Sequence, residues 1–180
     1  MNKMQTTTSS SRLEATRTLP SYVTAFVEPN ELNSVVEQLR GEPGIPLVAP
    51  TTGRHNLLVQ LSPSETAKVY KFVDRLRAMD GVEATRLLSP FEGHLTEKKL
   101  LPNEDFALIL LGVREEPRKV LEQLKQSPIH SACIILGESG IVVTLSGRNY
   151  REVMERVARM ARIPGVETTE TLFAYKPTWA

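Results

Sequence analysis

The sequence predicts an α+β protein built from two tandem copies of one module, each with the element order β-α-β-β-α-β. Three observations carry this prediction. The chain of 180 residues repeats itself at a constant offset, and each copy alternates short apolar runs with amphipathic segments of helical period. In addition, several expected strands are apolar on both faces, which predicts that the second face of each sheet packs against another surface.

The internal repeat is clearest in two blocks. Residues 79–85, MDGVEAT, align with residues 163–169, IPGVETT, and this match defines the offset between the copies. Residues 35–40, VVEQLR, match residues 120–125, VLEQLK, at an offset that is longer by one residue. A loop that differs by one residue explains this shift, so the two blocks together indicate a duplicated module.

The elements of the first copy follow from its apolar pattern. Runs of β-branched and aromatic residues predict the strands, and apolar residues at helical spacing predict two helices. Serines before Glu65 and the glycine at Gly81 supply the cap signals at the ends of the second helix. In chain order the six elements are Tyr22 to Val27, Glu31 to Arg40, Ile45 to Ala49, Asn56 to Leu61, Glu65 to Met79 and Val82 to Phe91.

The second copy repeats this order, and the offset places Tyr22 of the first strand on Phe106. Its last helix has the clearest pattern, because Val153, Val157 and Met160 recur at helical spacing. The six elements are Phe106 to Val113, Arg118 to Gln126, Ser131 to Leu136, Ile141 to Leu145, Asn149 to Arg162 and Val166 to Tyr175.

The repeat divides the chain into four parts. Residues 1–20 form a tail rich in Thr and Ser, which we expect to be flexible because its hydrophobicity is low. The tail lacks the apolar core that a secretory signal requires. We expect a first module over residues 21–94, a polar linker over residues 95–104 and a second module over residues 105–180.

Three strands predict burial on both of their faces. The runs Phe106 to Leu111, Asn56 to Leu61 and Ile141 to Leu145 are apolar throughout or nearly so, whereas a sheet with one wet face would alternate apolar and polar residues. The second face therefore packs against another sheet. The partner sheet is either the other copy in the same chain or a second chain, and we expect homo-oligomers.

Composition argues against several classes of protein. The formal net charge is +1, without any long run of like charges, which argues against direct binding of nucleic acid. Cys133 stands alone in an apolar run and is expected to be a small buried hydrophobe. The sequence has no apolar stretch long enough to cross a membrane, so we expect a soluble, cytoplasmic protein without a membrane partner.

A resemblance to a known family rests on short motifs. The segment TGRHNLLV over residues 52–59, followed by MDGVEAT over residues 79–85, resembles the effector-binding domain (RAM, ACT-like) of the Lrp/AsnC transcriptional regulators. The second copy carries the matching Pro-Gly-Val strand start, and together the two matches cover about Ser21 to Tyr175. The resemblance implies ferredoxin-like modules paired into a dimeric α/β barrel, oligomers that bind an amino acid or related metabolite, and a role in transcription regulation.

The chain departs from this family in two respects. No helix-turn-helix reader precedes Tyr22, so we expect a stand-alone effector-binding protein. The acidic residue of the family's turn is replaced by Asn56 in the first copy and by Gly140 in the second. A glycine in this turn permits close approach of a ligand, or it simply supplies the positive φ of a hairpin. If a ligand site persists, its expected residues are Gly53, Arg54, His55, Asn56, Glu138 and Ser139.

The sequence shows no recognisable catalytic or metal-binding constellation. The three histidines, His55, His94 and His130, are scattered, and no phosphate-binding loop, nucleophile elbow or dinucleotide fingerprint occurs. We therefore expect no catalytic residue, no metal and no cofactor. Two alternatives remain open: an interaction or scaffold protein, and a small dimeric α/β-barrel enzyme or haem protein in which His55 or His94 ligates haem.

Overall fold

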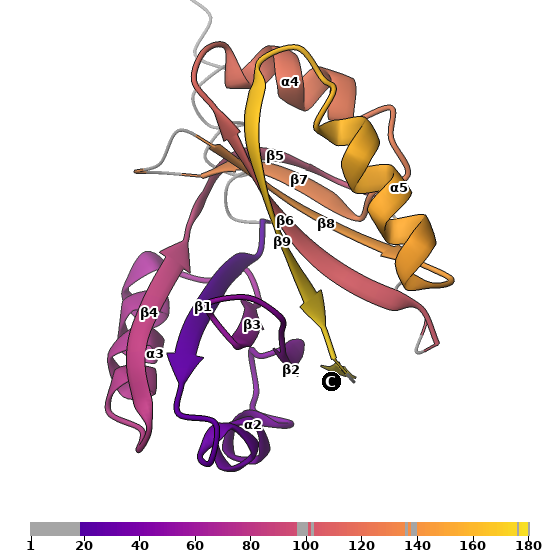
Figure 1. Ribbon diagram of the computed structural model, residues 1–180. Coiled ribbons are helices and arrows are strands. Elements are labelled where there is room, and N and C mark those ends of the chain that lie inside the picture. Colours follow the sequence, from indigo (N-terminus) through magenta and orange to yellow (C-terminus); the bar gives the residue numbers. More distant parts are fainter. Residues whose placement is uncertain are drawn as a thin grey trace, which may run out of the picture.

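The protein has an α+β fold of two antiparallel sheets and four helices, seen in a computed structural model (Figure 1). The structure describes residues 19–96, 101, 103–135, 137, 140–175 and 177–179. The expected tail therefore lies, for residues 1–18, outside the described residues. Among the helices of the described chain, none is both long and apolar enough to cross a membrane.

The elements of the first half follow the expected order, and those of the second half repeat it. The first half contains β1 (Ser21–Val27), α2 (Leu32–Leu39), β2 (Leu47–Pro50), β3 (Leu57–Leu61), α3 (Thr66–Arg77) and β4 (Val82–Leu88). The second half contains β6 (Asp105–Val113), α4 (Pro117–Leu124), β7 (Ser131–Ile135), β8 (Gly140–Gly147), α5 (Tyr150–Met160) and β9 (Val166–Ala174). Two further strands, β5 (Pro90–Leu95) and β10 (Thr178–Trp179), follow the two halves.

Each of these two further strands joins the sheet of the other half. Sheet A has the order β10-β2-β3-β1-β4, and sheet B has the order β5-β7-β8-β6-β9. The single strand expected over Val82 to Phe91 is thus two strands, because the chain leaves sheet A after Leu88 and enters sheet B at Pro90. Pro90 lacks the N–H that a continuous strand would donate, which suits the start of a new strand. The exchange of β5 and β10 closes the two sheets into a barrel.

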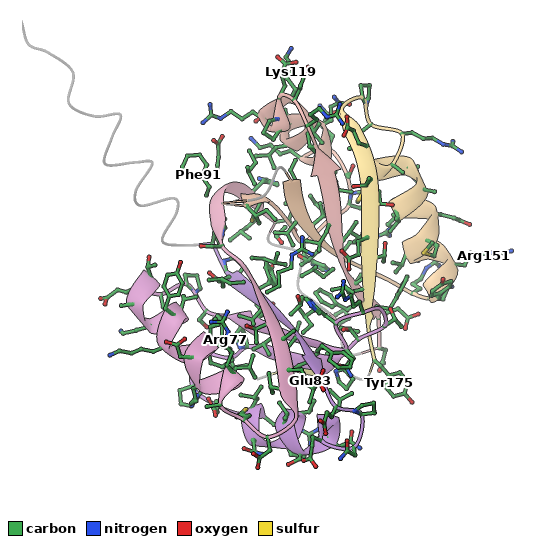
Figure 2. The ribbon with its side chains drawn as sticks, turned by 60° about the vertical axis from the view of Figure 1, so that its left-hand side comes forward. Arg77, Glu83, Phe91, Lys119, Arg151 and Tyr175 are labelled. Atoms are coloured by element: carbon green, nitrogen blue, oxygen red, sulfur yellow. The ribbon has the colours of Figure 1, made fainter. Side chains whose placement is uncertain are left out.

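Three apolar clusters hold this arrangement together. The helices α2 and α3 cover the outer face of sheet A, and α4 and α5 cover the outer face of sheet B (Figure 1). Charged side chains project from the outer helices, as Arg77 on α3 and Lys119 on α4 show (Figure 2). The inner faces pack on each other within one chain, through Leu47, Leu58, Leu88, Phe106, Leu108, Val142 and Leu172 among others. Packing within one chain thus accounts for the strands that are apolar on both faces.

Strand pairing corrects one alignment made from the sequence. Tyr22 lies opposite Gln60 and Leu88 in sheet A. The repeat equivalents of these two partners, Thr144 and Leu172, lie opposite Leu108 and not Phe106. Tyr22 therefore corresponds to Leu108. The alignment of Tyr22 with Phe106 is wrong because β6 has nine residues and β1 has seven, and the two additional residues shift the register.

Leu108→Ala should destabilise the protein strongly, because the Leu108 side chain is fully buried between the sheets. We expect the free energy of unfolding to fall by about 2–5 kcal/mol, as for other large-to-small changes in a core. Urea unfolding followed by circular dichroism measures this loss.

The matched control is Leu101→Ala, since Leu101 is 55% exposed. This variant should change the free energy of unfolding by no more than about 0.5 kcal/mol. Equal effects of the two substitutions would contradict the burial of the inner sheet faces.

Candidate functional site

A cavity with polar lining residues opens at one end of the barrel. At this end β6 and β7 finish and β8 and β9 begin, so that the inner face of sheet B is accessible. The cavity has a volume of about 440 Å³, and we call it the barrel mouth. Its lining residues are Arg86, Leu110, Leu111, Gly112, Ile135, Gly140, Ile141, Thr168, Thr169 and Glu170.

Two glycines lie in the wall of the barrel mouth. A Cβ at Gly112 would meet Oγ1 of Thr168, and a Cβ at Gly140 would lie 2.7 Å from the carbonyl oxygen of Leu111. Neither position has room for a side chain. Glycine at these positions therefore allows the strands of sheet B to pack closely at this end of the barrel.

An ion pair joins the two halves at the barrel mouth. Nη1 of Arg86 on β4 lies 3.5 Å from Oε2 of Glu170 on β9. The two residues are 84 positions apart, so they occupy equivalent places in the two halves. Their side chains are 30% and 51% exposed, and a pair of this kind contributes only about 0–1 kcal/mol to stability. Arg86 and Glu170 are therefore better placed to meet a ligand than to stabilise the fold.

His55 stands beside this ion pair. Its Nδ1 lies 2.7 Å from Oγ1 of Thr24, which is paired with Arg86 across β1 and β4. Burial lowers the pKa of His55, and the positive charges of Arg86 and Arg54 lower it further, while Glu170 acts in the opposite direction. The imidazole is hence neutral near pH 7. With Nδ1 held by Thr24, Nε2 is the ring nitrogen left to accept a proton or bind a metal.

The other residues of the expected turn have structural roles. Asn56 braces β1, because its Nδ2 donates to the carbonyl of Val27 over 2.7 Å and its Oδ1 accepts from the amide of Val27 over 2.8 Å. Gly53 has a φ of +102°, and a Cβ there would lie 2.9 Å from Cδ2 of Leu172.

Of the six residues expected to bind a ligand, His55 is close enough to Arg86 and Glu170 for their charges to act on its pKa, and Arg54 acts on the same pKa. Glu138 and Ser139 lie outside the described residues. Ligand binding by any of the six stays a prediction.

Sequence reasoning missed Arg86 and Glu170. Both residues lie on strands, where a charged residue is ordinarily taken as part of a solvent-facing side. A signal was nevertheless present, because the offset of the repeat places opposite charges at equivalent positions of the two copies. Residues equivalent under a twofold arrangement can meet at its axis, so this pairing was open to inference.

The remaining buried polar residues form satisfied networks away from the mouth. The hydroxyl of Tyr22 lies 3.2 Å from Oγ of Ser131, which lies 2.6 Å from Oγ1 of Thr144. Burial raises the pKa of Tyr22, which keeps the phenol neutral. Nε2 of His130 lies 2.7 Å from Oγ of Ser146. No buried side-chain nitrogen or oxygen lacks a partner in the part of the chain that the structure describes, so these networks are structural.

Cys133 and the acidic and histidine residues do not form a metal site. Burial raises the pKa of Cys133 to about 12, so the thiol stays protonated and unreactive, as expected for a small buried hydrophobe. Within the described ranges, no group of three His, Cys, Asp or Glu side chains is placed to hold a metal ion.

Comparison with solved structures finds barrels of the same fold. The siroheme decarboxylase NirDL aligns with a TM-score of 0.64 and 12% identity, over 89% of this chain and 72% of that one. An anthrone oxidase-like protein aligns with a TM-score of 0.55 and 10% identity, over 86% and 89%. A mutant chlorite dismutase from Candidatus Nitrospira defluvii aligns with a TM-score of 0.53 and 8% identity, over 86% and 88%. No family model and no curated protein matches the sequence. At these identities the likeness shows the fold alone.

The comparison corrects the family expected from the sequence. The neighbours are a siroheme decarboxylase, an anthrone oxidase-like protein and chlorite dismutase, which are dimeric α/β-barrel proteins and not RAM domains of Lrp/AsnC regulators. The expectation of an amino-acid effector and a role in transcription regulation is therefore wrong. The motifs behind this expectation reflect backbone geometry. Gly81 and Gly165 have φ of +79° and +95°, which a chain needs here to turn from a helix into an edge strand.

The neighbours of His55 should shift its pKa in opposite directions. In Arg86→Gln a positive charge disappears, so the pKa of His55 should rise toward 6.5, its ordinary value. In Glu170→Gln a negative charge disappears, so this pKa should fall further. NMR titration of the imidazole measures both changes.

Arg118→Gln is the control for these titrations, because Arg118 pairs with Glu92 on β5 and has no influence on the pKa of His55. Shifts of the same sign in Arg86→Gln and Glu170→Gln would contradict the placement of His55 between the two charges.

Proposed function

We propose that this protein binds a carboxylated tetrapyrrole at the barrel mouth, as a small dimeric α/β-barrel enzyme or haem protein. The observation that carries the proposal is the ion pair of Arg86 and Glu170 in the lining of the barrel mouth, with His55 close enough for both charges to act on its pKa. A second observation supports it. NirDL in co-complex with an iron-uroporphyrin III analogue aligns with a TM-score of 0.65 over 89% of this chain.

The residues of the barrel mouth fit the polar features of such a ligand. A volume of about 440 Å³ falls in the ordinary range of small-molecule sites, which is about 300–1,000 Å³. The guanidinium of Arg86 suits a carboxylate, to which it can donate two parallel hydrogen bonds. The neutral imidazole of His55 can bind a metal ion or accept a proton.

Each side chain has a definite task in this proposal. Arg86 binds a carboxylate of the ligand, and Glu170 competes for the same guanidinium until the ligand arrives. Thr24 orients His55 by holding its Nδ1, so that Nε2 is the ring nitrogen available to a ligand. An iron tetrapyrrole, when bound, would supply redox chemistry that none of these side chains provides.

The division of the chain into two modules and a linker is also a proposal. We infer that the two halves are ferredoxin-like modules over residues 21–94 and 105–180, joined by a linker over residues 95–104. The order β2-β3-β1-β4 in sheet A and its counterpart in sheet B support this division. β5 lies in the first range and pairs in sheet B, which is the strand exchange expected of modules that evolved as a pair. Assembly into homo-oligomers stays a prediction.

Iron uroporphyrin III should bind the protein with saturation, and titration followed by absorbance in the Soret region measures its affinity. Arg86→Gln should weaken binding about tenfold, the effect of losing one charge-assisted pair. Glu170→Gln should strengthen binding, because the competing carboxylate is gone.

Lys119→Gln on α4 is the charge-matched control, since Lys119 does not line the mouth and pairs with Glu116. It should bind iron uroporphyrin III like the unmodified protein. A spectrum that stays that of free iron uroporphyrin III throughout the titration would refute the proposal.

A further inference from the structure

A second cavity lies on the outside of the first half, between α3 and the loop that joins α2 to β2. Its volume is about 390 Å³, and it shares no lining residue with the barrel mouth. We call it the helix cleft. Its lining residues are Glu42, Pro43, Gly44, Ile45, Leu61, Ser62, Ser64, Lys68, Val69, Lys71, Phe72 and Arg75.

The floor of the helix cleft is apolar. Ile45, Leu61, Val69 and Phe72 are buried there, between 4% and 9% exposed. The loop is held against the sheet because the amide of Ser62 donates to the carbonyl of Gly44 over 2.9 Å. This floor offers hydrophobic contact to a ring or a chain without any rearrangement of the fold.

The rim of the helix cleft carries three cations. Arg75 is committed to the protein, because its Nη2 lies 2.5 Å from Oε2 of Glu42 and its guanidinium lies 5.4 Å from the centroid of the Phe72 ring. Lys68 and Lys71 differ from Arg75. Among the residues that the structure describes, neither ammonium has an ion-pair or hydrogen-bond partner. Two unengaged positive charges therefore border an apolar floor.

The equivalent helix positions in the second half carry the opposite charge. Helices α3 and α5 begin at Thr66 and Tyr150, which are equivalent positions of the repeat. Lys68 therefore corresponds to Glu152, and Lys71 corresponds to Glu155. Both cations of the first half are thus anions in the second.

The floor has changed as well, because Phe72 corresponds to Arg156. Nη1 of Arg156 donates to the carbonyl of Ser146 over 2.7 Å and to that of Pro128 over 3.2 Å, and its Nη2 pairs with Glu152. The guanidinium occupies the space above the sheet, and the corresponding cavity is smaller, about 250 Å³. The first half thus has an apolar cleft with a cationic rim, and the second half has a smaller cavity lined by Arg156 at the equivalent place.

We infer that the helix cleft is a binding site for an amphipathic anion, a ligand with one carboxylate, phosphate or sulfonate group on an apolar ring or chain. The apolar part lies on Phe72 and Val69. The anionic group lies between Lys68 and Lys71, where Ser62 and Ser64 offer further hydrogen-bond donors. Both parts are needed, because surface lysines alone bind anions weakly in water.

The test uses anilinonaphthalene sulfonate, a fluorescent amphipathic anion, and the full chain. The charge-swapped variant Lys68→Glu/Lys71→Glu gives the first half the charges of the second, and both residues are exposed, so folding should be preserved. We expect the probe to bind this variant about tenfold or more weakly. Phe72→Arg copies the closed floor and should weaken binding too, with a melting curve to show that the variant is folded.

The control is Lys119→Glu/Lys125→Glu on α4, which makes the same change in net charge on the second half. It should bind the probe within about twofold of the unmodified protein. The neutral analogue phenylnaphthylamine should not respond to the Lys68→Glu/Lys71→Glu exchange. Equal losses in the two charge-swapped variants, or no loss in either, would overturn the inference. The Arg86→Gln variant should keep the site, which separates this outcome from failure of the tetrapyrrole proposal.

Discussion

The burial of both faces of each sheet is the constraint on which the rest of the structure depends. Leu58, Leu108 and Val142 are fully buried on the inner faces, while the outer faces are covered by helices. A single half with this sequence would expose an apolar sheet, which water strongly disfavours. Packing the two sheets on each other removes this exposure. The exchange of β5 and β10 then pairs the edge strands β7 and β2, so the barrel has few open edges at these positions.

Closure of the barrel also decides where polar chemistry can occur. In the middle of the barrel, Tyr22, Ser131 and Thr144 are enclosed and must satisfy one another, which leaves them no capacity for a ligand. At the mouth, Arg86 and Glu170 are partly exposed and their mutual contact is long. Partial exposure leaves both groups accessible to solvent. The proposed site therefore lies where the apolar layers end.

The sequence predicted the local features of this fold better than the long-range ones. The element order followed from period and caps, for which neighbours in sequence suffice. The crossing of the chain at Pro90 did not, because the partner of β5 is β7, far along the chain. The same holds for the site. His55 was proposed from its turn, and its role stays a prediction, whereas Arg86 and Glu170 become a pair only in three dimensions. The Lrp/AsnC assignment failed because its short motifs describe turns that several barrel families share.

A chain that contains both halves can do what two identical chains cannot. In a symmetric pair of identical chains, a residue at the position of Arg86 would face its own copy, and two arginines would repel each other at the mouth. With both halves in one chain, the equivalent positions carry Arg86 and Glu170 and attract. The same freedom allows Phe72 to remain in one helix while Arg156 fills the corresponding place in the other. Differences of charge between equivalent positions are thus what a single chain with two halves permits, and they occur at both cavities for which we propose ligands.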